Sequence, residues 1–431
     1  MKLRKSVLLR ATGLVAVSSL LSGCAGLTGN TGGEDDAQTL TFTTWASDSE
    51  EQQFKALATA FEKENEGVTV DLNIVPYDGV FSGIDNQLAA GNAPDIFRVD
   101  YGNLGVYSSQ EQLLDVSSYF DEAEIDAFTP ALWEAVSYDD VPYGVPHQTD
   151  VSALLLNTAL MEQAGITDIP TTLEDAWTWE EFADVATRLR ASLPPEQYPF
   201  VYNWQLGGTP RWLSWVFQAG GAVLDEDGVT PAIDSPEGAE ALDFTKSFFE
   251  KNWVPPTSSV TSSGYADTVF AEQQTAMAFV GSFLVPELDG LADFEWTATY
   301  MPVNERGATD LGGNALVATA DTDNPDLAAA FLKFMVEPEN MTAFCAATNE
   351  LPTLTALAGD AVKFEIRPDV MPVFVDQASV IEPDDVRQLT SPAAAAISNA
   401  LQDQLELAFV EGKATDQTLA DLSVAIAEAA G

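Results

Sequence analysis

Histidine and cysteine are nearly absent from this chain of 431 residues, which contains one histidine and two cysteines. Histidine-based zinc sites and Ser-His-Asp triads need histidine, so His147 is the single candidate for histidine-dependent catalysis and a site of several histidines is excluded. Two cysteines cannot build a disulfide framework. Cys345 stands in an apolar segment, which predicts a buried, inert thiol. No metal or cofactor is expected.

Basic residues are also scarce: 18 Lys and Arg stand against 67 Asp and Glu, and the formal net charge is −49. Such a field repels nucleic acid and anionic membrane surfaces, so neither is expected to bind directly to the protein surface. The acidic residues are spread along the chain, which is typical of solubility or of adaptation to a salty or acidic habitat. Anionic and peptide ligands are disfavoured because their sites usually supply Arg or Lys.

Only the N-terminus carries a marked apolar run, over residues 11–21, and it is too short to span a bilayer as a helix of about 20 residues. It follows a basic segment, 1–10, which is the pattern of an export signal. The sequence Leu-Ser-Gly-Cys that ends at Cys24 resembles the bacterial lipoprotein signal, which implies that residues 1–23 are removed and Cys24 is lipidated. The alternative is an ordinary signal peptide with a chance cysteine. Residues 24–38 are predicted to be a flexible tether.

From residue 39 the pattern alternates strands and helices. Strands are predicted near 39–44, 68–74 and 94–100, with helices over 50–64 and 80–90 between them, which implies parallel pairing. Ligands bind beyond the carboxyl ends of such strands. Those ends carry aromatic and acidic side chains that suit a polyhydroxylated ligand: Trp45, Asp48, Tyr77, Asp100 and Tyr101.

The stretch 142–157 passes from turn residues through a polar run into the apolar strand 153–156. A chain of this length favours two domains. We therefore interpret this stretch as the first crossing between two lobes, with Asp150 in the cleft. His147 has no accompanying nucleophile or metal-ligand set, so a hinge or cleft-wall role is favoured over catalysis or a pH switch.

Several segments, in their order, resemble the cluster-1 extracellular solute-binding proteins of ABC importers, the maltose-binding-protein-like sugar-binding lipoproteins. The segments that carry the resemblance are 41–45, 93–97 before Asp100, 143–146 leading to 156–157, 275–277 leading to 281–282, and Gly313. The resemblance implies an α/β, type II, two-lobe periplasmic-binding-protein-like fold, each lobe a sheet flanked by helices. It also implies three crossings, near 146–152, 298–303 and 350–354. Lobe 1 would comprise 39–148 and 303–352, and lobe 2 would comprise 149–302 and 353–431.

The resemblance also implies ligand contacts. Asp100 and Tyr101 would bind from lobe 1, Asp150 would bind sugar hydroxyls, and Phe283 would be the stacking platform where Trp is usual. The returning strand adds Gly313 and Asn314, and a looser match adds Trp204, Trp212 and Arg387. The implied protein is a monomeric receptor without enzymatic activity, held outside the cytoplasmic membrane by lipid on Cys24. It would capture a di- or oligosaccharide by hinge closure and deliver it to ABC permease subunits.

Three alternatives remain open from the residues alone. A secreted glycoside hydrolase also needs aromatic side chains and two carboxylates. A polyamine receptor would suit an acidic cleft, and a lipid-anchored sensor or adhesin would lack the crossing pattern.

Overall fold

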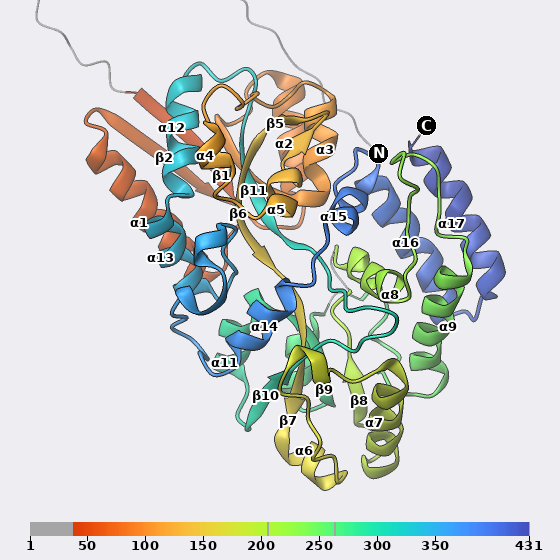
Figure 1. Ribbon diagram of the computed structural model, residues 1–431. Coiled ribbons are helices and arrows are strands. Elements are labelled where there is room, and N and C mark those ends of the chain that lie inside the picture. Colours follow the sequence, from red (N-terminus) through yellow and green to blue (C-terminus); the bar gives the residue numbers. More distant parts are fainter. Residues whose placement is uncertain (1–37, 205–206, 263, 431) are drawn as a thin grey trace, which may run out of the picture. The chain divides into compact units, whose positions relative to one another are not determined.

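The computed structural model describes residues 38–204, 207–262 and 264–430, which form two main β-sheets covered by helices (Figure 1). The predicted signal peptide, the tether as far as residue 37, and Cys24 lie outside the described residues. Within the described ranges, no helix is long and apolar enough to cross a membrane.

The first sheet has five strands in the order β2-β1-β3-β11-β6. β1 pairs in parallel with β2 and β3, as the alternating pattern predicts, whereas β11 runs antiparallel to both β3 and β6. A late strand therefore enters the sheet between two early ones. The strands are β1 (Gln38–Thr44), β2 (Val68–Ile74), β3 (Ile96–Asp100), β6 (Gly144–Asp150) and β11 (Gly312–Ala318).

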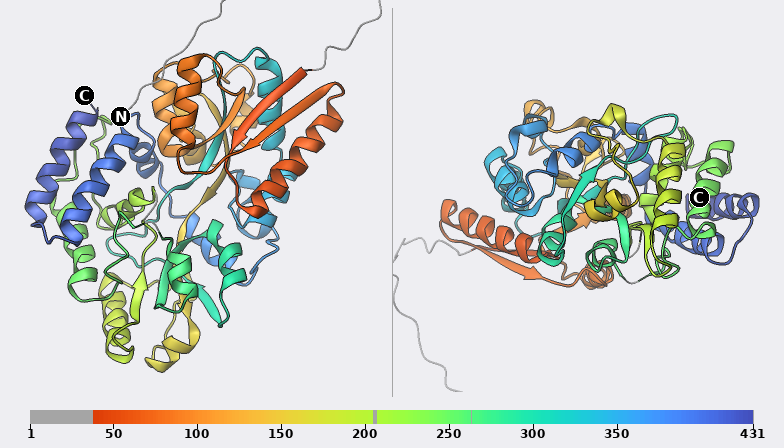
Figure 2. Two further views of the ribbon diagram at one scale, coloured as in Figure 1. Left: turned by 180° about the vertical axis from the view of Figure 1, so that it is seen from behind. Right: turned by 90° about the horizontal axis from the view of Figure 1, so that it is seen from below.

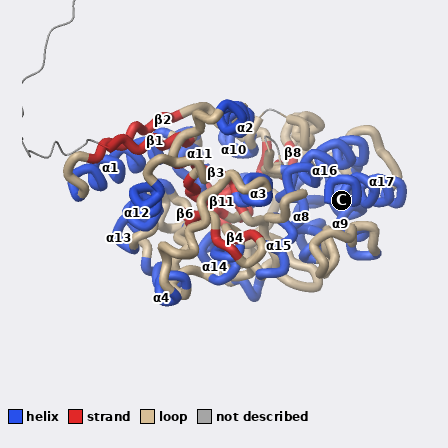
Figure 3. The backbone as a smooth tube through the Cα atoms, turned by 90° about the horizontal axis from the view of Figure 1, so that it is seen from above, coloured by secondary structure: helices blue, strands red, loops and turns tan. Residues whose placement is uncertain are grey.

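Helices cover both faces of this sheet because successive strand residues point to opposite sides. Leu40, Phe42 and Ile96 pack with α1 (Asp48–Glu64), α12 (Pro325–Met335) and α13 (Pro338–Thr348), and Figure 3 shows α1 beside β1 and β2. Phe97 and Val99 pack on the other face, with α2 (Val80–Ala90), α3 (Tyr101–Ser109) and α5 (Pro130–Glu134).

Local signals explain where α1 begins. Ser47 and Glu50 form a capping box, in which each side chain bonds the backbone N–H of the other residue. Phe54, Leu57 and Phe61 then recur at helical spacing and are buried. Because β1 ends at Thr44 and Ser47 caps α1, Trp45 and Ala46 form the loop between them.

The second sheet has four strands in the order β10-β7-β9-β8. One face packs against α7 (Trp179–Ser192), α8 (Leu213–Gln218), α9 (Pro236–Glu250), α16 (Ala394–Phe409) and α17 (Thr415–Ala430), and the last two lie beside α9 (Figures 1 and 2). The other face packs against α10 (Ala266–Ala271), α11 (Val285–Leu291) and α14 (Met371–Ala378). The strands are β7 (Ser152–Asn157), β8 (Tyr198–Val201), β9 (Thr275–Gly281) and β10 (Trp296–Thr299).

Three segments connect the two sheets. Val151 alone separates β6 of the first sheet from β7 of the second (Figure 1). The chain returns between Thr299 and Gly312, and Leu351 pairs with Thr149 as the chain leaves again. The predicted two-lobe α/β fold is confirmed, and the second connection is longer than the range 298–303 proposed from the sequence.

The helix α15 (Pro383–Leu389) does not follow the predicted assignment of 353–431 to the second lobe alone. Val386 packs in the core of the first lobe, against α5. Gln388 accepts a hydrogen bond from the backbone of Val223, in the second lobe. Because an isolated apolar position on a short helix does not reveal its partner, the sequence could not place this helix.

Short elements complete the described chain. They are α4 (Glu122–Ile125), α6 (Thr158–Gln163), the β4–β5 hairpin (Ser137–Tyr138, Val141–Pro142) and five 3₁₀ turns at Leu173–Asp175, Thr209–Trp212, Ser282–Leu284, Thr355–Leu357 and Gly359–Ala361.

Candidate functional site

Asp100, the last residue of β3, is the centre of a hydrogen-bond network at the carboxyl end of the first sheet. The Tyr77 hydroxyl donates to its Oδ2 at 2.8 Å, and Asn314 Nδ2 donates to its Oδ1 at 2.6 Å. Asn103 adds a longer bond to Oδ2. All three donors are uncharged, so the carboxylate is oriented without an ion pair.

The network continues from Asn314 to the first crossing. Gln148 Nε2 donates to Asn314 Oδ1 at 2.6 Å, and the Tyr101 hydroxyl donates to the Gln148 carbonyl at 2.9 Å. Gly313 has a left-handed φ of 98°, and a β-carbon there would lie 2.4 Å from the Thr149 Cα atom. Glycine is therefore required for β11 to approach β6 this closely.

Trp45 follows β1 and forms the aromatic edge of this region. Its ring meets Tyr77 and Phe81 edge to face, with centroids 5.2 and 5.8 Å apart. The Arg98 guanidinium lies 4.7 Å from its centroid and donates to its carbonyl at 3.2 Å. The indole is half-buried, which leaves apolar surface for a ligand.

Arg98 belongs to a buried ionic cluster beneath Trp45, in which it contacts Glu50 at 2.6 Å and Glu350 at 3.1 Å. Burial and the nearby Glu50 carboxylate raise the pKa of Glu350 well above its ordinary value. Burial also disfavours the ionised form of Glu50, but the Arg98 charge and the hydrogen bonds from Ser47 and Arg98 together outweigh burial and lower the pKa of Glu50. The surroundings thus favour the ionised form of Glu50, whereas at Glu350 burial favours the neutral form.

A second ionic cluster lies at the crossings. Arg211 contacts Asp150 Oδ1 at 3.2 Å through Nη2, and its Nη1 is paired with Asp310 Oδ2. Asp310 Oδ1 also accepts the backbone N–H of Ser152 at 3.1 Å. Arg211 precedes α8 of the second lobe, so this cluster ties that lobe to the first and second crossings.

Phe283 stands beside this cluster, with its ring centroid 5.8 Å from the Arg211 guanidinium carbon. Two glycines make room for Asp150 here: a β-carbon at Gly312 would lie 2.3 Å from Oδ2, and one at Gly281 would lie 3.0 Å from Oδ1. The structure thus brings the predicted acid and the predicted aromatic platform into one place.

The two polar clusters are electrostatically coupled. Burial raises the pKa of Asp100 to about 6, and the negative charge of Asp150 contributes to that rise, while Tyr77, Arg98 and Asn314 oppose it. A β-carbon at Gly207, in the second lobe, would lie 3.3 Å from the Tyr77 hydroxyl. Residues of both lobes therefore face one region, with acceptors from Asp100 and Asp150.

Four predicted ligand contacts do not join this region. Trp204 and Trp212 are fully buried in the core of the second lobe, where their indole N–H groups donate to the Ser258 carbonyl and the Thr245 hydroxyl. The two indoles are therefore core residues, and their prediction as ligand contacts is corrected, because a pattern of aromatic residues does not distinguish a core from a site.

Asp48 and Arg387 are also placed elsewhere. Asp48 is exposed in the first turn of α1, and it forms no bond to the Asp100 network. Arg387 is exposed and pairs with Glu134 and Asp384. A carboxylate in a first turn is stabilised by the helix dipole, which explains Asp48 without a ligand.

His147 faces the core of the first lobe and is completely buried. Its ring stacks on Phe54 at 5.7 Å and meets Phe344 edge to face at 4.5 Å, and neither ring nitrogen has a hydrogen-bond partner within the described ranges. Burial, with a smaller contribution from Arg98, lowers its pKa to about 3. It is therefore a neutral core residue, and neither a cleft wall nor a catalytic base.

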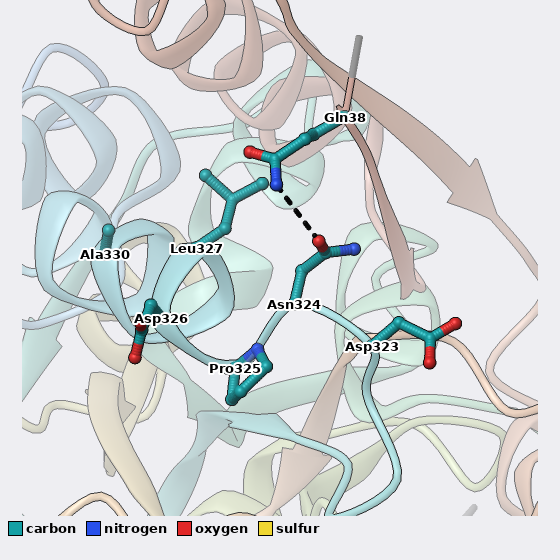
Figure 4. A pocket seen from close by; sticks show the side chains of 7 residues that line it. All are labelled: Gln38, Asp323, Asn324, Pro325, Asp326, Leu327 and Ala330. Atoms are coloured by element: carbon teal, nitrogen blue, oxygen red, sulfur yellow. Dashed lines mark hydrogen bonds between the residues drawn. The ribbon is translucent and has the colours of Figure 1, made fainter. Parts of the chain in front are cut away.

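Two surface hollows lie away from these clusters. One is lined by Gln38, Leu327, Ala330 and the segment 323–326 at the start of α12, where Gln38 donates to Asn324 at 3.2 Å (Figure 4). The other lies around Arg367, which stacks on Trp296 at 3.7 Å. Neither contains a residue of the candidate site.

Sequence reasoning missed Arg211, Asp310 and Gln148 as parts of the site. Gln148 was visible in the polar run that includes Asp150, at alternate positions of one strand. Arg211 and Asp310 are distant from Asp150 in the sequence, and no local pattern joins them. The scarcity of basic residues was the only available signal, since an arginine in an acid-rich chain must compensate carboxylates somewhere.

Two α/β lobes joined by three crossings, with polar and aromatic side chains from both lobes at their meeting point, define a two-lobe ligand-binding protein. The family model for bacterial extracellular solute-binding proteins matches residues 46–342. The chain belongs to that family.

The relatives have low sequence identity to this chain, but the matches cover most of its length. The maltodextrin-binding protein MdxE of Bacillus subtilis is 26% identical over 323 residues, which cover 71% of each chain. The maltooligosaccharide ABC transporter solute-binding lipoprotein of Streptococcus pneumoniae is 25% identical over 365 residues, or 82% of each chain. Among solved structures, the cyclic α-maltosyl-1,6-maltose binding protein of Arthrobacter globiformis superposes with a TM-score of 0.76 at 20% identity, covering 91% of this chain and 98% of that chain.

Proposed function

We propose that this protein is the extracytoplasmic receptor of an ABC importer and that it captures a maltodextrin-like di- or oligosaccharide between its lobes. Similar chains bind maltodextrin and maltooligosaccharides, according to their names. The observation that carries the proposal is the pair of carboxylates, Asp100 and Asp150, held from different strands beside aromatic rings.

The chemistry of these side chains suits a neutral sugar. Carboxylates accept hydrogen bonds from hydroxyl groups, and a hydrogen bond to a charged group contributes about 1.5–3 kcal/mol. Trp45 and Phe283 offer ring faces for the C–H surface of a pyranose. Tyr77 and Asn314 hold Asp100 in a fixed orientation, so less conformational entropy is lost when a ligand binds.

Binding would act through hinge closure. Val151 and the two other crossings connect lobes that each have their own core. A sugar that contacts Asp100 on one side and Asp150 and Phe283 on the other makes all its contacts only in the closed state, so it shifts the population toward closure. The closed form would then dock on the permease subunits and release the sugar.

Lipid attachment at Cys24 would hold this receptor at the outer face of the cytoplasmic membrane. Replacing Cys24 with Ser should move the protein from the membrane fraction to the medium and abolish incorporation of labelled fatty acid. The anchor is rejected if the Cys24→Ser variant stays in the membrane fraction and the unaltered protein incorporates no labelled fatty acid.

Calorimetric titration with maltose, maltotriose, spermidine and a tripeptide tests the ligand class. We expect micromolar or tighter binding of a maltooligosaccharide and none of spermidine or peptide. Release of reducing ends from maltoheptaose, followed in the same samples, should stay at the background rate. Hydrolysis would favour the glycosidase, and binding of spermidine alone would reject the sugar.

A further inference from the structure

The Arg211 guanidinium occupies a position that a ligand could otherwise reach. Its side chain is 14% exposed, and it lies between Asp150, 7% exposed, and Asp310, 3% exposed. Its carbon is 5.8 Å from the Phe283 ring centroid. The acid and the aromatic ring expected to contact a sugar are thus both in contact with one fixed cation.

The charge of Arg211 is compensated by the two carboxylates beside it. Within the described ranges, Arg211 is the only cationic side chain in an ion pair with Asp150 or Asp310. Arg98, the other arginine nearby, is committed to Glu50 and Glu350. Removal of the Arg211 charge would leave two buried carboxylates facing each other without a counterion, a position that favours any ligand cation.

We propose that Arg211 determines ligand specificity by filling the cation position beside Asp150, so that the site accepts uncharged sugars and excludes an ammonium group. This inference rests on the proposed sugar-binding function. A ligand ammonium group would have to compete with a guanidinium that already bonds both carboxylates and is tethered to the same chain. Without Arg211, Asp150 and Asp310 become a binding site for the amine of an amino sugar.

Arg211 also positions Asp150. Its Nη2 contacts Oδ1 of Asp150, whereas Asp310 has a second partner in the Ser152 N–H group. Lysine carries the same charge but lacks the planar fork that bonds two carboxylates together. An Arg211→Lys variant therefore separates the effect of charge from the effect of geometry.

The test compares maltotriose with maltotriose in which one terminal 6-hydroxyl is replaced by an amine. Calorimetry is performed on the unaltered protein, on Arg211→Met and Arg211→Lys, and on Arg188→Met, whose arginine lies on the exposed side of α7 and bonds the Gly165 carbonyl. We expect the unaltered protein and Arg188→Met to bind maltotriose at least tenfold more tightly than the amine. The affinity of Arg211→Met for maltotriose should fall at least tenfold, and this variant should bind the amine more tightly than maltotriose. Arg211→Lys should still bind maltotriose more tightly than the amine.

The inference is overturned if Arg211→Met still binds maltotriose more tightly than the amine and its affinity for maltotriose stays within twofold of that of the unaltered protein. If the variant does not fold, Arg211→Met with Asp310→Asn removes one uncompensated charge, and it should fold and show no preference for the amine. If the unaltered protein binds no sugar, the proposed function fails, and the inference is then judged by stability alone. Guanidinium chloride at about 10 mM should raise the melting temperature of Arg211→Met but not of Arg188→Met, because it refills the cation position; equal responses overturn the inference.

Discussion

Two arginines in this protein each stand between two carboxylates, and they differ in depth. Arg98, between Glu50 and Glu350, is 1% exposed, whereas Arg211, between Asp150 and Asp310, is 14% exposed. Around Arg98, burial and the Glu50 carboxylate raise the pKa of Glu350 and so favour its neutral form. Around Arg211, both carboxylates belong to the crossings, and the cluster borders the candidate site. The two ionic clusters thus differ in depth: one is enclosed in the core of the first lobe, and the other borders the candidate site.

The deeper cluster predicts the largest effect. Arg98→Met should destabilise the protein by about 3–5 kcal/mol, because it leaves Glu50 as a buried charge without its partner. Chemical denaturation at pH 7 measures the change. Glu350→Gln is the matched control: the raised pKa of Glu350 favours its neutral form, so the neutral amide should cost about 1 kcal/mol or less. Equal effects of the two changes would show that Glu350 is ionised and that the clusters do not differ.

His147, close to Arg98, predicts the next largest effect, on acid stability. The unfolded chain binds a proton at His147 near pH 6.5, but the folded protein binds it only near pH 3. The stability that this residue contributes above pH 6.5 is therefore lost as the pH falls from 6.5 toward 3, by on the order of 3 kcal/mol at pH 4. His147→Leu should remove this loss, measured as the difference between the variant and the unaltered protein from pH 7 to 4.

The difference between variant and parent matters because Asp100 and Asp267 act in the opposite direction. Burial raises the pKa of both to about 6, so their contribution to stability is present at low pH and is lost as the pH rises through 6. A His147→Leu curve parallel to that of the unaltered protein would contradict a neutral, buried histidine.

The shallower cluster predicts an effect on affinity instead of stability. Asp150→Ala should weaken sugar binding by about 1.5–3 kcal/mol, or roughly 10- to 150-fold, because it removes a charged acceptor. The fold should survive, since Arg211 keeps Asp310 as its partner and remains partly exposed. Asp184→Ala, on the exposed side of α7, is the control for loss of one charge. Unchanged affinity would remove Asp150 from the site.

The smallest effect is predicted at Tyr77, in the network without an ion pair. Tyr77→Phe should weaken binding by about 0.5–1.5 kcal/mol, because Asp100 loses one neutral donor. The hydrogen bond from Tyr77 lowers the pKa of Asp100, so its loss should shift the pH midpoint of binding upward from about 6. Calorimetry from pH 5 to 8 measures both. A midpoint that stays in place would show that Asp100 is not the titrating group.

Much of the fold could be predicted because its signals are local. The alternation in 68–74 and the apolar spacing in α1 specify a strand and a helix without knowledge of the rest of the chain. The placement of Tyr77, Asp100 and Tyr101 followed from the rule that parallel strands gather their carboxyl ends at one edge. Asn314 and Gly313 could be placed only through the family resemblance, because β11 enters the sheet from a distant part of the sequence.

The α/β pattern, the strand that becomes the first crossing and the acid at its end, Asp150, could all be predicted from local sequence patterns. The burial of His147 in the core from that same strand, and the pairing of Arg211 with Asp150 across 61 positions of the chain, follow from the packing of distant segments. Trp204 and Trp212 were assigned to the core in the same way. The physical reason is that periodicity records which residues prefer burial, whereas the partner of a charge depends on which distant segments the packed lobes bring within a few ångströms.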